Sequence, residues 1–283
     1  MAEPATATTE TVRQALVRAA ARLASTSDTP RLDAELLMAH ALETSRDRLL
    51  MAELERAAPT GFEALVDRRA ACEPVAYIVG HRAFWTIELA VTPAVLIPRP
   101  DSETLIEAAV DACLSPPRTI LDLGTGSGAL LLAALSEWPQ ARGTGVDRSP
   151  TAVATARANA QALGLATRAD IREGDWGREL ADSFDLILCN PPYIAVGETL
   201  PADVALYEPA SALFAGADGL DDYRLLMPQI ARLLAPQGLA VVEIGHRQAD
   251  AVCALAGQGG LDTAVRTDLA GRDRAILLRR TKD

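Results

Sequence analysis

Several residue types that support particular kinds of function are scarce in this sequence. Only four cysteines and three histidines occur among 283 residues, and they lie far apart. This scatter argues against a disulfide framework and against a zinc site. No run approaches the roughly 18 consecutive apolar residues that suggest a membrane span, and no basic segment followed by an apolar run opens the chain. We therefore expect a cytoplasmic globular protein with no metal and no membrane contact.

The sequence also contains fewer basic than acidic residues. The net charge is −11, residues 101–283 hold −9 of it, and only Lys282 is a lysine among 27 basic residues. An acidic surface repels a phosphate backbone, whereas most nucleic-acid binders present a basic face. This balance argues against DNA or RNA as a direct partner. The sequence does have 49% hydrophobic residues, enough for the cores of one large domain and a smaller one.

The N-terminal part shows helical periodicity. Apolar residues recur at helical spacing from Val12 to Leu23, and a second helical run follows Pro30. From Tyr77 to Val91 aromatic and β-branched residues predict a β-hairpin. We expect a small helical domain over residues 1–75 and a hairpin linker over residues 76–98. A substrate-recognition role suits the position of the helical domain better than that of a solubilising appendage.

After Pro117 short apolar runs alternate with helical patterns. Such alternation is typical of an α/β fold with a doubly wound, mostly parallel sheet and helices on both faces. We assign residues 99–283 to this domain. The expected strands lie near Thr119–Leu123, Gly143–Val146, Asp170–Glu173, Leu186–Cys189, Leu239–Ile244, Thr263–Val265 and Ala275–Leu278.

A glycine-rich loop follows the first of these strands. It reads Gly124-Thr125-Gly126-Ser127-Gly128, and Asp147 ends the next strand. Glycines let the backbone approach a ligand closely, and an acidic residue about 20 positions on accepts hydrogen bonds from ribose hydroxyls. The third glycine comes one residue too early for the dinucleotide pattern. The spacing resembles the cofactor loop of class I methyltransferases, whose ligand, S-adenosylmethionine, contains no pyrophosphate.

A tryptophan follows the third expected strand. In Gly174-Asp175-Trp176 the carboxylate can accept a hydrogen bond from an adenine amino group, and the indole can pack against the ring. The same tryptophan could instead belong to the core. We include Trp176 among the candidate cofactor contacts.

The fourth expected strand is followed by Asn190-Pro191-Pro192-Tyr193. An amide nitrogen is a poor nucleophile because its lone pair is delocalised into the carbonyl. The Asn190 side-chain oxygen and the Pro191 carbonyl can each accept one hydrogen of a target NH2, which turns the nitrogen toward a methyl sulfonium. Tyr193 can pack on the planar group. The motif therefore predicts methyl transfer to an amide, an in-line displacement that requires neither a metal nor a strong base.

Over nearly its whole length the chain resembles the HemK/PrmC family, protein-(glutamine-N5) methyltransferases that act on class I peptide chain release factors. The blocks that carry the resemblance include Glu73–Gly80, Leu96–Glu103, Gly124–Gly128, Asn190–Tyr193, Tyr207–Pro209, Asp218–Asp221, Glu243–Gly245 and Gly271–Arg274. Two departures occur: Ser102 stands where many relatives show threonine, and Trp85-Thr86-Ile87 replaces a segment that often has a tyrosine and a glycine.

The resemblance implies a class I, Rossmann-like methyltransferase that uses S-adenosyl-L-methionine and modulates translation termination. It implies cofactor contacts at Gly124 to Gly128, Asp147, Trp176 and Asn190, and places the target glutamine of a Gly-Gly-Gln loop on Asn190 to Tyr193. The helical domain and hairpin then help to dock the release factor. We expect a monomer.

Three alternatives share parts of this pattern. A sister enzyme that methylates a glutamine of a large-subunit ribosomal protein uses the same fold and motif. An adenine-N6 or guanine-N2 nucleic-acid methyltransferase presents the same planar NH2 to the site, but it usually needs a basic target-recognition region. A catalytically silent binding protein could also keep the fold. Loss of activity on replacing Asn190 separates the last alternative from the others.

Overall fold

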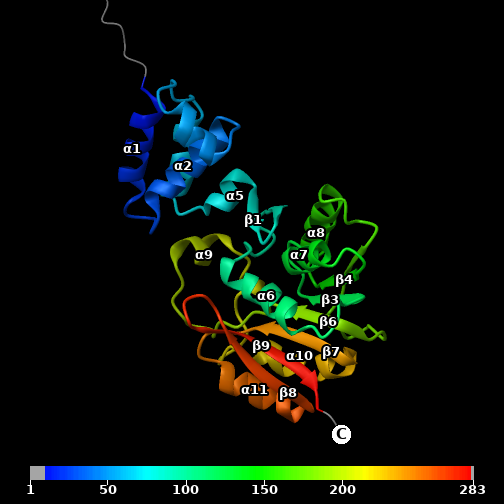
Figure 1. Ribbon diagram of the computed structural model, residues 1–283. Helices are drawn as coiled ribbons and strands as arrows, with labels where there is room; N and C mark the ends of the chain where they lie inside the picture. The colour runs from blue at the N-terminus through cyan, green and yellow to red at the C-terminus, as the bar shows by residue number, and fades with distance from the viewer. Residues whose placement is uncertain (1–9, 282–283) are drawn as a thin grey trace, which may run out of the picture. The chain divides into compact units, whose positions relative to one another are not determined.

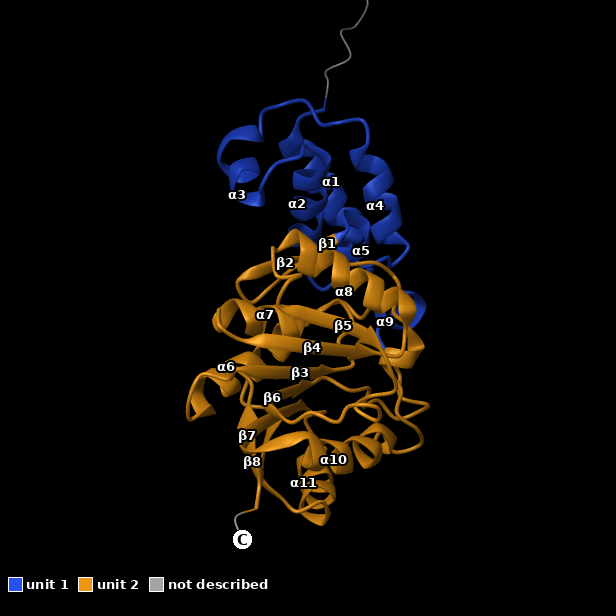
Figure 2. Cartoon of the chain, turned by 90° about the vertical axis from the view of Figure 1, so that its right-hand side faces the viewer, with its two compact units in different colours: residues 1–80, 200–207 blue, residues 81–199, 208–283 orange. Residues whose placement is uncertain are grey.

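The computed structural model describes residues 10–281, which divide into two compact units. The first holds the chain up to Gly80 together with residues 200–207, and the second holds residues 81–199 and 208–283 (Figure 2). No helix among the described residues is both long enough and apolar enough to cross a membrane.

The first unit is helical. Its first helix begins with reciprocal caps, because Thr11 Oγ1 accepts from the Gln14 backbone and the Gln14 side chain accepts from the Thr11 backbone. A buried ion pair of 2.6 Å joins Arg69 Nε to Asp33 Oδ2 inside the unit. The unit contains α1 (Val12–Leu23), α2 (Pro30–Ala41), α3 (Arg46–Arg48), the π-helical turn η1 (Leu49–Glu53), α4 (Phe62–Ala70), α5 (Val75–Val79) and α9 (Ala202–Tyr207).

The hairpin is shorter than the sequence predicts. Residues Val75–Val79 form α5, which ends at Gly80 with a φ of 83°. Buried Tyr77 and Ile78 lie on this helix, so their aromatic and β-branched character reflects burial rather than a strand. The expected start of the hairpin at Tyr77 was therefore wrong. The antiparallel pair is β1 (His81–Phe84) and β2 (Ile87–Ala90).

The second unit is built on a seven-stranded sheet with the order β5-β4-β3-β6-β7-β9-β8. Figure 2 shows β5, β4, β3, β6 and β7 following one another in this order. The first five of these strands are parallel, whereas β9 runs antiparallel to both of its neighbours. This confirms the predicted doubly wound, mostly parallel sheet. The strands are β3 (Thr119–Leu123), β4 (Arg142–Asp147), β5 (Ala169–Glu173), β6 (Phe184–Cys189), β7 (Leu234–Glu243), β8 (Leu261–Thr267) and β9 (Asp273–Arg280).

Two hydrophobic layers cover the faces of this sheet because successive strand residues point to opposite sides. Ile120 of β3 belongs to the layer under α6, α7 and α8, whereas its neighbour Leu121 belongs to the layer under α10 and α11 (Figure 1). The helical elements of the unit are η2 (Pro100–Ser102), α6 (Glu103–Ala112), α7 (Ala129–Glu137), α8 (Pro150–Ala162), η3 (Ala210–Ala212), α10 (Asp221–Leu233) and α11 (Ala249–Gln258).

The strand order places a crevice where the site is expected. From β3 the chain proceeds outward to β4 and β5, then returns to β6 on the other side of β3. Ligands of open α/β sheets bind at the carboxyl ends of the strands where the order reverses in this way. The loop beginning at Gly124 leaves β3 and Asn190 leaves β6, so the two motifs meet at this point.

Candidate active site

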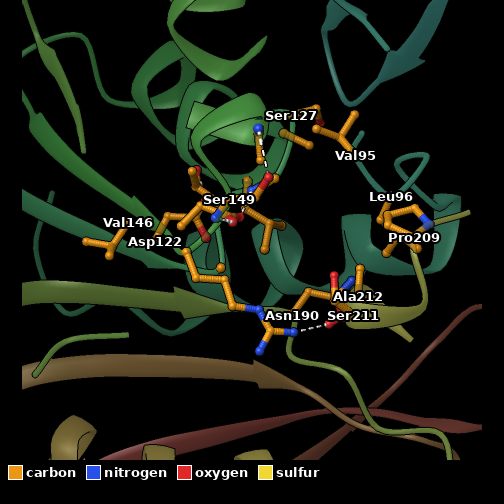
Figure 3. Close-up of a pocket in the computed structure, with 18 of the residues that line it drawn as sticks. Val95, Leu96, Asp122, Ser127, Val146, Ser149, Asn190, Pro209, Ser211 and Ala212 are labelled. Carbon is orange, nitrogen blue, oxygen red and sulfur yellow. Dashed lines mark hydrogen bonds between the residues drawn. The ribbon is translucent and has the colours of Figure 1, made fainter. Parts of the chain in front are cut away.

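A pocket of about 310 Å³ lies at the carboxyl ends of β3, β4 and β6, entirely within the second unit. Figure 3 shows side chains from separate segments gathered around it, including Asp122, Ser149, Asn190 and Ser211. Eight of the sequence-predicted site residues line it: Gly124, Thr125, Gly126, Ser127, Asp147, Trp176, Asn190 and Pro192.

Three predicted residues are not among those that line the pocket. Gly128, with a φ of 86°, precedes the first residue of α7. Pro191 is buried, and Tyr193 is partly buried with its hydroxyl directed to Glu243. The cofactor contact expected of Gly128, and the catalytic and substrate-binding roles expected of Pro191 and Tyr193, stay predictions.

The glycine loop is held to the end of β4. The Gly124 and Thr125 amides donate to the Val146 carbonyl at 2.9 and 3.0 Å. Asp147 accepts from the Gly126 amide at 2.9 Å through Oδ2 and from the Ser149 amide at 2.9 Å through Oδ1. Because each carboxylate oxygen offers two lone pairs, both oxygens can accept a further hydrogen bond from a ligand.

Asp122, the residue before the last of β3, was not singled out from the sequence. Its Oδ2 accepts from Thr125 Oγ1 at 2.7 Å and from the Leu131 amide at 3.3 Å, whereas its buried Oδ1 has no protein partner. Burial raises the pKa of Asp122 to about 7. An unpaired buried acceptor is costly, and this one lines the pocket, where a ligand donor can satisfy it.

Trp176 has a left-handed backbone conformation with a φ of 53°. For an aromatic residue this conformation costs about 1–3 kcal/mol and persists only where the surroundings enforce it. A Cβ added to Gly124 would lie 2.9 Å from the Trp176 ring, so the loop and the indole fit together only because residue 124 is glycine. The ring lines the pocket beside the loop.

Asn190 is tied to a chain of hydrogen bonds. Its Nδ2 donates to Ser102 Oγ at 3.0 Å, and Ser102 Oγ donates to Glu243 Oε2 at 2.5 Å. Tyr193 donates to Glu243 Oε1 at 3.3 Å. With Nδ2 engaged, Oδ1 is the polar atom of Asn190 that can accept from a ligand. In the sequence, Ser102 and Glu243 stand out only as parts of blocks shared with the family, and no catalytic role was assigned to either.

A long segment returns to the pocket after the Asn190 motif. Ile194 and Phe214 form an isolated parallel bridge that closes this segment. Between them, Pro209, Ser211 and Ala212 line the pocket, and the Arg148 guanidinium donates to the Ser211 carbonyl at 2.6 Å. Sequence reasoning missed these contacts, since neither Ser211 nor Arg148 belongs to a recognisable motif.

Nearby, Glu208 accepts from the Ile97 amide at 3.3 Å and forms an ion pair with Arg99. Glu103 accepts from the Trp85 amide at 2.8 Å. Arg99, the residue directly before η2, thus holds the returning segment through Glu208.

Comparison with known proteins identifies both parts of the chain. The PrmC N-terminal domain matches residues 14–80, and a methyltransferase domain matches residues 114–257. The release factor glutamine methyltransferase of Rhodospirillum rubrum is 46% identical over 257 residues, which cover 89% of this chain and 79% of that protein. The enzyme of the same name from Moorella thermoacetica is 44% identical over 285 residues, covering 96% and 100%.

A solved methyltransferase structure from Pyrococcus furiosus is similar in fold. Its TM-score is 0.55 at 14% identity, over 78% of this chain and 98% of that one. At this identity the likeness concerns the fold alone, which is the class I methyltransferase fold.

Proposed function

Because this chain belongs to the family of release factor glutamine methyltransferases, we propose that it transfers a methyl group from S-adenosyl-L-methionine to N5 of the glutamine in a Gly-Gly-Gln motif of class I peptide chain release factors. The observation that carries this proposal is the arrangement of Asn190. Its Nδ2 is held by Ser102, which leaves Oδ1 to accept from a target amide in the pocket that also contains the glycine loop.

The pocket residues fit S-adenosylmethionine. The unpaired, buried Oδ1 of Asp122 suits the ammonium of the methionine part, and Asp147 suits the ribose hydroxyls. Trp176 offers an aromatic surface for the adenine. When bound, this cofactor supplies a methyl group on a sulfonium, an electrophile with a good leaving group.

The residues after β6 act on the target amide. Asn190 Oδ1 and the Pro191 carbonyl each accept one hydrogen of the NH2 group, which fixes the plane of the amide so that the nitrogen lone pair would face the methyl carbon. Neither Pro191 nor Pro192 has a backbone N–H that could compete for these acceptors. Tyr193 packs against the planar amide. The N–C bond would form as the S–C bond breaks, and the nitrogen would then release its extra proton to solvent water.

The proposal also assigns a role to each part of the chain. Residues 1–75 recognise the release factor, residues 76–98 link the two domains, and residues 99–283 carry out the methyl transfer. The protein acts in the cytoplasm as a monomer. In support, the match to the PrmC N-terminal domain covers the helical region, and every proposed catalytic residue comes from the second unit.

Mass spectrometry tests the substrate. A release factor, the large-subunit ribosomal protein and a DNA duplex are each incubated with the protein and isotope-labelled S-adenosylmethionine. We expect one labelled methyl on the Gly-Gly-Gln glutamine, and none on a release factor in which that glutamine is replaced by glutamate. Label only on the ribosomal protein or on DNA would overturn the proposed substrate, and label on none of them would overturn the activity.

Replacing Gly124 tests the fit between the loop and Trp176. The change Gly124→Ala is expected to raise the dissociation constant for S-adenosylmethionine by about 10-fold or more, because the new Cβ displaces the indole. Isothermal titration calorimetry measures this constant.

Gly164→Ala is the matched control. Gly164 has a similar φ of 69°, but no atom lies within 4 Å of its added Cβ. Both variants bear the left-handed strain of about 1–2 kcal/mol, and only Gly124→Ala disturbs the ring. Equal effects of the two changes on cofactor binding would show that Trp176 does not contact the cofactor.

A further inference from the structure

Two buried side chains connect with Asn190, and neither had a role in the sequence-based mechanism. For the reaction proposed above, on which this inference rests, we propose that Glu243 is a positioning residue. Through Ser102 it fixes which atom of the Asn190 amide faces the target. Glu243 is 1% exposed and is not among the residues that line the pocket, so it acts through its neighbours rather than by touching the substrate.

A single hydrogen, that of the Ser102 hydroxyl, determines how the Asn190 amide is oriented. The Ser102 hydroxyl has one proton, which it donates to Glu243 Oε2, and it can therefore only accept from Asn190. Accepting requires that Asn190 turn its Nδ2 toward Ser102 and its Oδ1 the other way. An ionised carboxylate at position 243, which has acceptors and no donor, enforces this order.

Reversing the direction of these hydrogen bonds would turn the Asn190 side-chain amide around, so that its oxygen and nitrogen exchange places. If a donor replaced Glu243 Oε2, the Ser102 proton would be free to point at Asn190, which would then present Oδ1 to Ser102. Asn190 Nδ2 would face the target NH2, placing two donors against each other. The target nitrogen would lose the acceptor that orients it, so turnover would fall while the cofactor contacts stayed in place.

The second oxygen of Glu243 holds the other end of the motif. Tyr193 donates to Oε1 at 3.3 Å, and the Gln248 side chain donates to the Tyr193 carbonyl at 3.0 Å. The end of β7 is itself fixed, since the Tyr223 hydroxyl donates to the Glu243 carbonyl at 2.9 Å. One carboxylate therefore connects the first and last residues of the Asn190 to Tyr193 loop.

The surroundings of Glu243 make this arrangement sensitive to pH. Burial raises the pKa of Glu243 to about 7, opposed by the Ser102 hydrogen bond and the Arg274 guanidinium and assisted by the Asp101 carboxylate. Above this pH the carboxylate only accepts and the order of hydrogen bonds holds; below it the protonated carboxyl can donate to Ser102. The other titratable groups that face it are Cys189, Tyr193 and Tyr223, each with a raised pKa and thus neutral near pH 7.

Kinetics provide the first test. With the release factor as substrate, we expect Glu243→Gln to reduce kcat by about 30-fold while the dissociation constant for S-adenosylmethionine stays within about 2-fold. Wild-type kcat should decline as the pH falls through 7, and this decline should vanish in Glu243→Gln. Ser102→Ala should reduce kcat similarly, and Ser102→Thr, which keeps the hydroxyl, should restore most of it. Unchanged kcat and an unchanged pH profile in Glu243→Gln would overturn the proposal.

Nuclear magnetic resonance provides a second test that needs no substrate. The chain has only two asparagines, Asn159 and Asn190, so selective ¹⁵N-asparagine labelling yields two side-chain amide groups. Asn159 is buried, with Nδ2 donating to the Ala90 and Ser127 carbonyls and Oδ1 accepting from the Ala90 amide. It serves as the internal control, and the Asn190→Ala variant assigns the other pair.

We expect the Asn190 amide signals to shift with a midpoint near pH 7 in the wild type and to lose most of this shift in Glu243→Gln, where Asp122 still titrates in the pocket, with the Asn159 signals unchanged in both. Unchanged Asn159 signals also establish that the variant is folded. If the chemical shifts of the Asn190 amide did not change with pH in the wild type, the inference would be overturned even if the release factor is methylated. Absence of methylation with normal titration would instead overturn the proposed function.

Discussion

Asn190→Ala is expected to reduce methyl transfer to the release factor by about 10³-fold, with cofactor affinity weakened by less than about 10-fold. The change removes the Oδ1 acceptor and the Nδ2 contact with Ser102. A neutral amide reacts only when its nitrogen is oriented, and misplaced or lost orienting groups cost on the order of 10²- to 10³-fold in rate. Single-turnover kinetics with labelled cofactor separate the transfer step from binding.

Asn190→Asp is the matched control for this prediction. It keeps the volume of the side chain and an oxygen acceptor toward the pocket, but it places a second oxygen against Ser102, whose proton is committed to Glu243. We expect turnover between that of the wild type and that of the alanine variant. Near-normal turnover in Asn190→Ala would refute the orientation mechanism and favour a role in binding alone.

Asp147→Ala is expected to raise the dissociation constant of S-adenosylmethionine by about 100-fold, equivalent to roughly 3 kcal/mol. The variant loses the acceptors proposed for two ribose hydroxyls and frees the Gly126 and Ser149 amides that the carboxylate holds. Because Asp147 does not act on the target amide, kcat at saturating cofactor should remain within a few fold of the wild type. Calorimetric titration and initial rates at several cofactor concentrations measure the two quantities.

Asp147→Asn separates the two contributions. An asparagine can keep one oxygen acceptor for a backbone amide, but it offers the ribose a donor and carries no charge. We expect an intermediate loss of affinity. If Asp147→Ala bound the cofactor as tightly as the wild type, the assignment of this carboxylate to the ribose would fail.

The motifs could be located from the sequence because local rules govern them. The strand Thr119–Leu123 has the bounds expected from its apolar run, and the glycines that follow it are a turn signal that does not depend on distant residues. In a parallel sheet the loops that follow the strands all leave from the same edge. Once β3 and β6 are predicted to be parallel strands of one sheet, Gly124 and Asn190 are therefore expected at the same edge. The α5 helix shows where such local rules fail, because the buried residues Tyr77 and Ile78 have the residue types of a strand although they lie on a helix.

The partners of Asn190 could not be located in this way. Ser102 and Glu243 lie 141 positions apart in the chain, yet their side chains meet at 2.5 Å. Neither residue type at either position indicates a hydrogen-bond partner until η2 is packed beside the end of β7. The unpaired Oδ1 of Asp122 could not be found from the sequence either, because the lack of a hydrogen-bond partner depends on how the site is packed.

By itself, the sequence determined the fold class and located the glycine loop, Asp147 and the Asn190–Tyr193 motif, because strand periodicity, turn chemistry and short motifs are encoded by neighbouring residues. The tertiary structure alone decided which groups surround them. It placed α9 in the helical unit, brought Ser211 to the pocket, and gave the buried Glu243 carboxyl two hydrogen-bond donors. These contacts join segments that are remote in the chain, and their energies depend on burial and geometry, which arise only when the chain is folded.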